Sequence, residues 1–274
     1  MKVAIILHGG AGNWQPEKIP RANEILKEAA IIGIKILKNN GSSLDAVEKA
    51  VNHLENSGYF NCGIGSIAQS DGKVRMDAGI MDGHALKCGA VASIEDIKNP
   101  ISIARRLMDK TDHCLIVSKY AVDFALRNGF DKFKIKPKKF KKGNSVSSDT
   151  VGAIALDRNG RIAVANSTGG RFGKMLPGRV GDSPIAGAGF YANKFAGAAT
   201  TGIGEAFIRT NAASRAVYIV EQGKSVKEAA KLAMRFVTEK TKCDGGMIIL
   251  DRKGNHVACF TTKAMPWVYK FVNL

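Results

Sequence analysis

A sharp change in composition at Thr150 limits what the surrounding chain can form. Residues 131–144, which precede it, are rich in lysine and have neither a helical nor a strand period, so we expect a solvated loop there. Residues 150–156 form a short apolar segment that is followed by a turn at 157–160. Such a segment is typical of a buried strand. Thr150 is therefore predicted to be the first residue of a core strand, just after an exposed loop.

This placement of Thr150 suits one form of covalent catalysis. A threonine that opens a strand is ordinarily explained by its β propensity alone. If the chain were cut before Thr150, however, that residue would carry both a hydroxyl nucleophile and a free α-amine. An α-amine has a reference pKa of roughly 7.7 to 8.0, so near neutral pH it can accept the hydroxyl proton. Thr150 is therefore a candidate N-terminal nucleophile that needs no histidine as its base.

Glycine-rich motifs on both sides of Thr150 occur in a characteristic order. They are HGGAG at 8–12, FNCGIGS at 60–66, MDAGIMDG at 76–83, NSTGG at 166–170, PGRVGDSP at 177–184, GAGFYA at 187–192 and TGIGE at 201–205. Together they resemble the plant-type L-asparaginase and isoaspartyl peptidase family of N-terminal nucleophile hydrolases, whose relatives include aspartylglucosaminidase and taspase. The resemblance covers nearly the whole chain.

The periodicity of the chain predicts an α+β protein. We expect helices over 21–39, 42–55, 99–109, 119–128, 205–222 and 226–239, a short strand over 113–117, and hairpins over 150–167 and 246–261, the second of which closes the protein. Paired helices and consecutive hairpins argue against a doubly wound sheet. The resemblance implies a four-layer αββα sandwich, with two antiparallel sheets between helix layers. It also implies one domain over 1–274, autocleaved into 1–149, with a basic tail at 131–149, and 150–274.

The resemblance assigns the bond-making residues. Thr150 is the nucleophile, and the precursor is cut between Asp149 and Thr150. The hydroxyl of Thr168 lies beside the nucleophile and its amine, while Thr201 and the backbone N–H of Gly202 stabilise the developing oxyanion. The family often has glycine before the nucleophile, whereas this chain has aspartate, as aspartylglucosaminidase and taspase do.

Substrate recognition is assigned in the same way. Arg179 and Asp182 lie three residues apart in a loop rich in proline and glycine, which by itself could indicate a surface ion pair. The resemblance implies that Arg179 binds the α-carboxylate of an amino acid and Asp182 its α-ammonium. Gly202 and Gly204 supply further backbone contacts, and Asn61 lines the same cleft. Ile203 is apolar where relatives often have a polar residue.

The resemblance also implies a structural sodium ion but no cofactor for catalysis. The ion would be held by backbone carbonyl groups at the end of the second predicted helix and in the loop that follows it, those of Leu54, Glu55, Ser57, Phe60, Cys62 and Ile64. Backbone ligands leave almost no pattern in the sequence. The five cysteines show no spacing typical of a zinc site, and we expect them to be free buried thiols in a reducing compartment.

The chain is strongly basic, with 41 lysine and arginine residues against 24 acidic ones and a net charge of +17. Much of the excess lies in 132–142, but no nucleic-acid-binding motif accompanies it, so we expect a solvated lysine-rich surface. No segment approaches the roughly 20 apolar residues that span a bilayer. The first ten residues resemble a strand more than a signal peptide, so we expect a cytoplasmic protein without a membrane or specific nucleic-acid partner.

The leading hypothesis is an autoprocessing amidohydrolase that cleaves isoaspartyl dipeptides and hydrolyses L-asparagine to L-aspartate and ammonia. A second enzyme hypothesis is an aspartylglucosaminidase-like or taspase-like hydrolase, which the aspartate at position 149 would fit. A hypothesis from another class is an unprocessed polyanion-binding protein that uses residues 132–142. The partners of the leading hypothesis are a small-molecule substrate and a second copy of the processed protein, in the (αβ)₂ assembly typical of the family.

Overall fold

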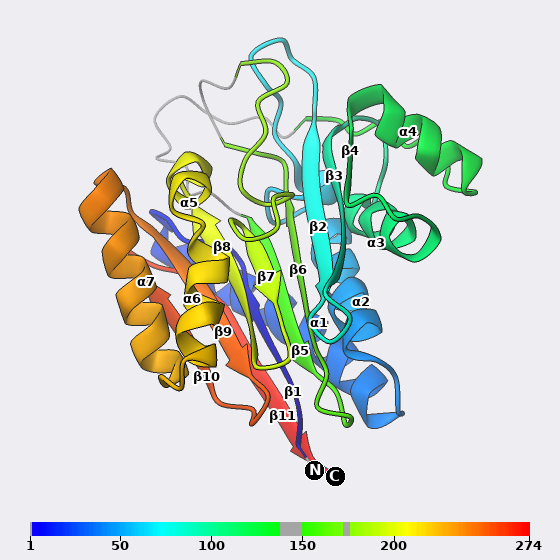
Figure 1. The fold of residues 1–274 in the computed structure, drawn as a ribbon. Coiled ribbons are helices and arrows are strands. Elements are labelled where there is room, and N and C mark those ends of the chain that lie inside the picture. Colours follow the sequence, from blue (N-terminus) through cyan, green and yellow to red (C-terminus); the bar gives the residue numbers. More distant parts are fainter. Residues whose placement is uncertain (1, 138–149, 172–175) are drawn as a thin grey trace.

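Two stacked sheets lie between two layers of helices in the computed structural model, which describes residues 2–137, 150–171 and 176–274. Helices of the N-terminal half cover the outer face of one sheet, and helices of the C-terminal half cover the other (Figure 1). This arrangement confirms the αββα sandwich predicted from the sequence.

The larger sheet includes the strand that follows Thr150. Its strand order is β11-β1-β5-β6-β2-β3-β4, and every neighbouring pair is antiparallel except β3 with β4. The strands are β1 (Lys2–His8), β2 (Met76–Asp82), β3 (Lys87–Ile94), β4 (Leu115–Val117), β5 (Val151–Leu156), β6 (Ile162–Thr168) and β11 (Trp267–Asn273). β5 is central and fully buried, as its apolar composition predicts.

The smaller sheet stacks on the larger one. Its order is β10-β9-β8-β7, with all pairs antiparallel, and its strands are β7 (Phe190–Ala192), β8 (Ala196–Gly202), β9 (Gly245–Asp251) and β10 (His256–Phe260). Side chains from both sheets, including Ile154, Val164, Phe190 and Ile248, form a continuous buried cluster between them. This interior layer brings the end of β8 close to the start of β5.

The helices pack their apolar faces onto the sheets. The larger sheet is covered by α1 (Ile19–Lys38), α2 (Ser43–Asn56), α3 (Pro100–Lys110) and α4 (Ser118–Arg127), and the smaller one by α5 (Gly204–Thr210), α6 (Ala212–Glu221) and α7 (Val226–Thr241). Ser42 caps α2 and Ser225 forms a capping box at α7, which satisfies backbone N–H groups left unpaired at helix starts. In the parts of the chain that the structure describes, no helix is long and apolar enough to cross a membrane.

Several element predictions are wrong in detail. The helix expected over 205–222 is broken at Asn211, whose left-handed φ of 46° separates α5 from α6. The hairpin of β9 and β10 does not close the protein, because β11 follows it and pairs with β1 along its whole length. Strand β5 begins at Val151, so Thr150 lies just before it. Strands β2, β3, β7 and β8 were not predicted from periodicity.

The described part of the basic segment before Thr150 contacts the rest of the protein at two points. Ile135 is 6% exposed and belongs to the core under the larger sheet. The backbone N–H of Phe133 donates to the carbonyl of Asp96 at 2.8 Å. Residues 131–137 therefore form a loop, as predicted, but this loop is not fully solvated, because Ile135 is buried. Residues 138–149, including Asp149 and most of the predicted basic tail, lie outside the described residues.

The cysteines are free, as expected, but they are not all buried. Cys62 is buried, Cys114 is exposed, and Cys88, Cys243 and Cys259 are half-buried. The prediction of buried thiols is therefore right only for Cys62. Among the described residues, no group of three or more histidine, cysteine or acidic side chains could hold a metal ion.

Candidate active site

Thr150 and Thr168 meet at one end of the larger sheet. The hydroxyl of Thr150 donates to that of Thr168 at 3.2 Å, and the hydroxyl of Thr168 also accepts from the backbone N–H of Gly170 at 3.0 Å. The pairing of Val151 with Ser167 explains the contact, because it leaves Thr150 and Thr168 next to one another at the strand ends. Both side chains are buried, and Thr150 is 5% exposed.

Asn61 fixes the turn that follows Thr168. Its Nδ2 donates to the carbonyl of Gly170 at 2.7 Å, and its Oδ1 accepts from the backbone N–H of Ile67 at 3.1 Å. Its own carbonyl accepts from the N–H of Gly169 at 2.7 Å. The structure therefore places Asn61 beside the threonine pair, with both ends of its amide engaged in holding the backbone.

Thr201 and Gly202 end β8, in the sheet opposite Thr150. The hydroxyl oxygen of Thr201 accepts from the backbone N–H of Ala11 at 3.1 Å, so the HGGAG segment borders the same site. Gly202 has a φ of 144°, and a Cβ there would lie 2.8 Å from Cα of Gly245. Only glycine suits this backbone position.

Arg179, Asp182 and Gly204 converge although they come from different segments. A Cβ on Gly204 would lie 2.9 Å from both Nη2 of Arg179 and Oδ1 of Asp182, so the missing side chain leaves room for both groups. The other oxygen of Asp182 accepts from the hydroxyl of Thr200 at 2.8 Å. Because Thr200 precedes Thr201, strand β8 connects the charged cluster to the predicted oxyanion pair.

Two carboxyl groups in the charged cluster were not assigned a role from the sequence. Glu205 accepts two hydrogen bonds from Arg179, from Nε at 2.9 Å and from Nη2 at 3.0 Å, a bidentate pairing that fixes the plane of the guanidinium. Asp77 is buried and accepts from the backbone N–H groups of Ser93 at 2.8 Å and Gly181 at 3.1 Å. Asp77 thereby supports the loop between Arg179 and Asp182. Both residues lie within or beside motifs of the resemblance, which is the signal that could have identified them.

Burial controls the charge state of the carboxyl groups. It raises the pKa of Asp182 to about 6, against the opposite effects of the Thr200 hydrogen bond and the positive charge of Arg179. Burial likewise raises the pKa of Asp77 to about 6. At neutral pH both groups are ionised, but they gain protons at a higher pH than exposed aspartates do.

A sequence model described as asparaginase matches residues 1–141 and 130–273. The chain belongs to this asparaginase family. It is 43% identical over 286 residues to an isoaspartyl peptidase/L-asparaginase of Rattus norvegicus, covering 97% of this chain and 86% of that protein. The protein of the same name in Homo sapiens is 41% identical, over 97% of this chain and 92% of the relative. A plant-type L-asparaginase of Pyrococcus horikoshii is 44% identical over 295 residues, covering 97% and 96% of the two chains.

The segment assigned to a sodium ion through the family resemblance folds back on itself. Leu54 and Glu55 belong to the last turn of α2, and Ile64 lies in the short 3₁₀ helix η2 (Gly63–Gly65). A Cβ on Gly63 would collide with the carbonyl of Glu55, so the two ends of the segment touch. The carbonyls of Leu54, Phe60 and Cys62 already accept backbone hydrogen bonds, and that of Leu54 also accepts from the hydroxyl of Ser57 at 2.7 Å. The structure thus brings Glu55 and Gly63 together, while three of the six carbonyls assigned to the ion already accept hydrogen bonds.

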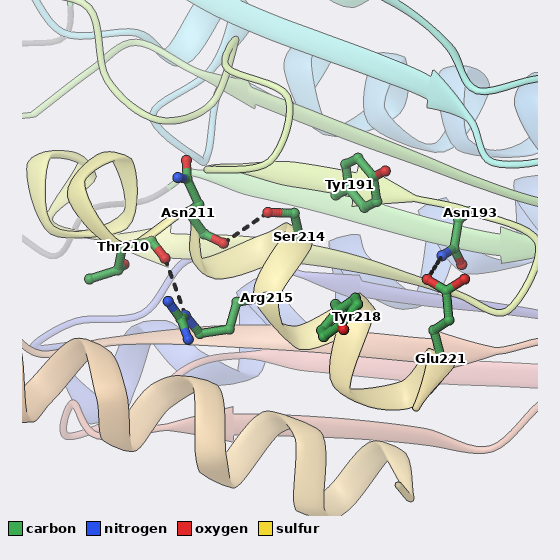
Figure 2. Close-up of a pocket in the computed structure, with 8 residues that line it drawn as sticks. All are labelled: Tyr191, Asn193, Thr210, Asn211, Ser214, Arg215, Tyr218 and Glu221. Atoms are coloured by element: carbon green, nitrogen blue, oxygen red, sulfur yellow. Dashed lines mark hydrogen bonds between the residues drawn. The ribbon is translucent and has the colours of Figure 1, made fainter. Parts of the chain in front are cut away.

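A surface pocket lies apart from this asparaginase-family site. It has a volume of about 400 Å³ and is lined by residues of β7 and α6 and of the segments that adjoin them: Tyr191, Asn193, Thr210, Asn211, Ser214, Arg215, Tyr218 and Glu221 (Figure 2). Several of its polar groups already pair with one another, such as Asn193 with Glu221 at 3.0 Å. None of the predicted site residues lines it.

Proposed function

We propose that this chain is an N-terminal threonine hydrolase that cleaves itself between Asp149 and Thr150 and then hydrolyses L-asparagine and β-aspartyl dipeptides. The observation that carries the proposal is the buried hydroxyl pair of Thr150 and Thr168 at the start of the nucleophile strand. The convergence of Arg179 and Asp182 on Gly204 supports the substrate class, as do the printed names of the relatives.

Self-cleavage would proceed through an ester. The Thr150 hydroxyl adds to the carbonyl carbon of Asp149, and the peptide nitrogen leaves with a proton to become the free α-amine of Thr150. Water then opens the ester, which restores the hydroxyl and leaves a carboxylate on Asp149. The products are residues 1–149 and 150–274 of what we take to be one domain spanning 1–274.

Turnover would reuse the same hydroxyl. The α-amine of Thr150 accepts the hydroxyl proton while the oxygen attacks the side-chain carbonyl of the substrate, and the leaving ammonia or amine takes that proton. Water hydrolyses the resulting aspartyl ester. The Thr201 hydroxyl and the Gly202 N–H would stabilise the oxyanion, and each such donor is typically worth about 3 to 4 kcal/mol.

The charged cluster would select an aspartyl unit with free α-groups. Arg179 would bind the substrate α-carboxylate with the part of its guanidinium that faces Gly204, while Glu205 holds the Nε edge. Asp182 would bind the α-ammonium, and Gly202 and Gly204 would allow the backbone to approach the substrate. An α-linked aspartyl residue has no free α-carboxylate and should be excluded.

Three further features belong to the proposal. The carbonyls of Leu54, Glu55, Ser57, Phe60, Cys62 and Ile64 would hold a structural sodium ion, while catalysis uses no cofactor. The processed protein would assemble as (αβ)₂. Its free cysteines favour a reducing, cytoplasmic compartment.

A substrate panel tests the proposed specificity. The mature protein should release aspartate from L-asparagine and from β-aspartyl-leucine, and it should leave α-aspartyl-leucine and N-acetyl-asparagine intact. Faster cleavage of a glycosylated asparagine would favour the aspartylglucosaminidase-like alternative, and cleavage within an α-linked peptide the taspase-like one. Inactivity on the whole panel, together with salt-sensitive binding of nucleic acid, would favour the polyanion-binding alternative.

A further inference from the structure

Two fully buried polar side chains near Thr150 have atoms without hydrogen-bond partners among the described residues. They are His8, through Nε2, and Asn166, through Oδ1. Leaving a buried polar atom unpaired typically costs about 1 to 3 kcal/mol. Such atoms in a folded protein are normally satisfied by protein groups or by ordered water.

The strand register places His8 and Asn166 on either side of one glycine. His8 pairs with Gly152 across β1 and β5, and Gly152 pairs with Asn166 across β5 and β6. Residues directly opposite one another in antiparallel strands project to the same face of the sheet. A Cβ on Gly152 would collide with both Nε2 of His8 and Oδ1 of Asn166. The two unpaired atoms therefore approach the same point above Gly152.

The hydrogen bonds of Asn166 fix which end of its amide faces Gly152. Its Nδ2 donates to the carbonyls of Gly189 at 2.7 Å and Thr200 at 3.1 Å, so Oδ1 must point the other way and needs a donor. Burial lowers the pKa of His8 to about 3, against the opposite effect of a hydrogen bond with the Thr150 backbone. A neutral imidazole can donate from one nitrogen and accept at the other.

We propose that His8 and Asn166 are positioning residues that bind one water molecule above Gly152, and that this bridge fixes Thr150 relative to Thr201. The water donates one hydrogen bond to Oδ1 of Asn166 and forms a second hydrogen bond with Nε2 of His8. Thr150 lies just before β5, two residues ahead of Gly152, and its hydroxyl meets Thr168, two residues after Asn166 on β6. On the other side, Asn166 binds the carbonyl of Thr200, the neighbour of Thr201. The bridge thus links the nucleophile in one sheet with the oxyanion residue in the other.

A crystal structure of the mature protein that resolves ordered waters tests the site directly. The expected result is one water within hydrogen-bonding distance of both Nε2 of His8 and Oδ1 of Asn166. A direct His8–Asn166 hydrogen bond, or a His8 ring turned to another partner, would overturn the proposal. This measurement does not depend on which substrate the enzyme uses.

The kinetic test rests on the proposed function. His8→Phe keeps a planar ring without nitrogens and should lower kcat for asparagine between about 10- and 100-fold, a range typical of a misplaced reacting group, with KM little changed because Arg179 and Asp182 are untouched. His8→Gln restores a polar group and should recover most of kcat. Because His8→Phe and Gly152→Ala remove the same water, combining them should cost no more than the worse single variant. The exposed His84 gives the control His84→Phe, which should match the wild type.

Three kinetic outcomes would contradict the proposal: an unchanged kcat in His8→Phe, no recovery in His8→Gln, or fully additive losses. If His8→Phe folds but is not processed, the same variants are compared by their rates of self-cleavage and not by kcat. Inactivity of the wild type on asparagine would defeat the proposed function alone, since the crystallographic test of the water site would still stand.

Discussion

The hydroxyl of Thr150 donates a 3.2 Å hydrogen bond to the hydroxyl of Thr168. The hydroxyl of Thr168 also accepts from the N–H of Gly170. Replacement of Thr168 by valine therefore leaves two buried donors without an acceptor, the Thr150 hydroxyl and the Gly170 N–H. We expect Thr168→Val to reduce kcat on asparagine by at least about tenfold, and Thr168→Ser, which keeps the hydroxyl, to retain most of it. Steady-state kinetics of the two variants test this. Equal activity of the valine and serine variants would show that the hydroxyl has no role.

Arg179 is expected to act in substrate binding and not in self-cleavage, because the precursor presents no α-carboxylate at the site. Hydrogen bonds to charged groups are worth about 1.5 to 3 kcal/mol, so Arg179→Ala should lower kcat/KM for asparagine by about 10- to 150-fold. The amount of processed protein on a denaturing gel should stay the same. Arg235, an exposed arginine paired with Glu239 at 2.6 Å, gives the control Arg235→Ala. Unchanged kinetics in a folded Arg179→Ala protein would remove Arg179 from the site.

The pH dependence should show two titrating groups in the free enzyme. Below about 6, the raised pKa of Asp182 leaves its carboxyl neutral and unable to pair with the substrate ammonium. The α-amine of Thr150, with a reference pKa of roughly 7.7 to 8.0, also gains a proton as the pH falls and stops acting as a base. A plot of log kcat/KM against pH should therefore steepen from a slope of one towards two below about pH 6.

The plot for kcat should keep a slope of one in the same range. Bound substrate ammonium holds Asp182 ionised, so of the two groups that contact the substrate only the Thr150 amine titrates in the complex. Measurements of both parameters from pH 5 to 8 separate the two groups. A single slope of one in kcat/KM down to pH 5 would mean that Asp182 does not bind the ammonium.

Substitutions in the two parts of the basic segment should affect stability differently. Ile135 is buried in the core, so Ile135→Ala should destabilise the protein by about 2 to 4 kcal/mol. Charge reversal at Lys138, Lys139, Lys141 and Lys142, outside the described residues, should change the free energy of unfolding by about 0.5 kcal/mol or less. Denaturant unfolding of both variants in a Thr150→Ala single chain measures the difference. Nucleic-acid binding at physiological salt that disappears on charge reversal would instead indicate a functional polyanion site.

The sandwich fold could be predicted because the motifs resemble those of one family, whereas periodicity alone located only part of it. Strands β2 and β8 are buried on both faces along almost their whole length, so they lack the alternation by which a half-buried strand is recognised. The break at Asn211 was missed because apolar residues continue on both sides of it. A single asparagine in the left-handed region ends one helix without a glycine or proline to mark the place.

The site residues themselves could be predicted more fully than the residues that hold them in place. Arg179 and Asp182 share a recognisable motif, but the residues that hold them lie far away in the sequence. Asp77 reaches the Arg179–Asp182 loop only because β2 lies beside β6 in the sheet. Glu205 is the last residue of a recognised motif, yet nothing in the sequence shows that its carboxylate would meet Arg179. Such contacts depend on the tertiary arrangement of strands and not on local spacing.

The central claim, that Thr150 becomes an N-terminal nucleophile, is tested most directly by intact-mass analysis of the purified protein and its Thr150→Ala variant after incubation. The account predicts two fragments from the wild type, with the masses of residues 1–149 and 150–274, and a single uncut chain from the variant. The same two fragments in both proteins, or a wild type that stays whole while hydrolysing asparagine, would contradict it.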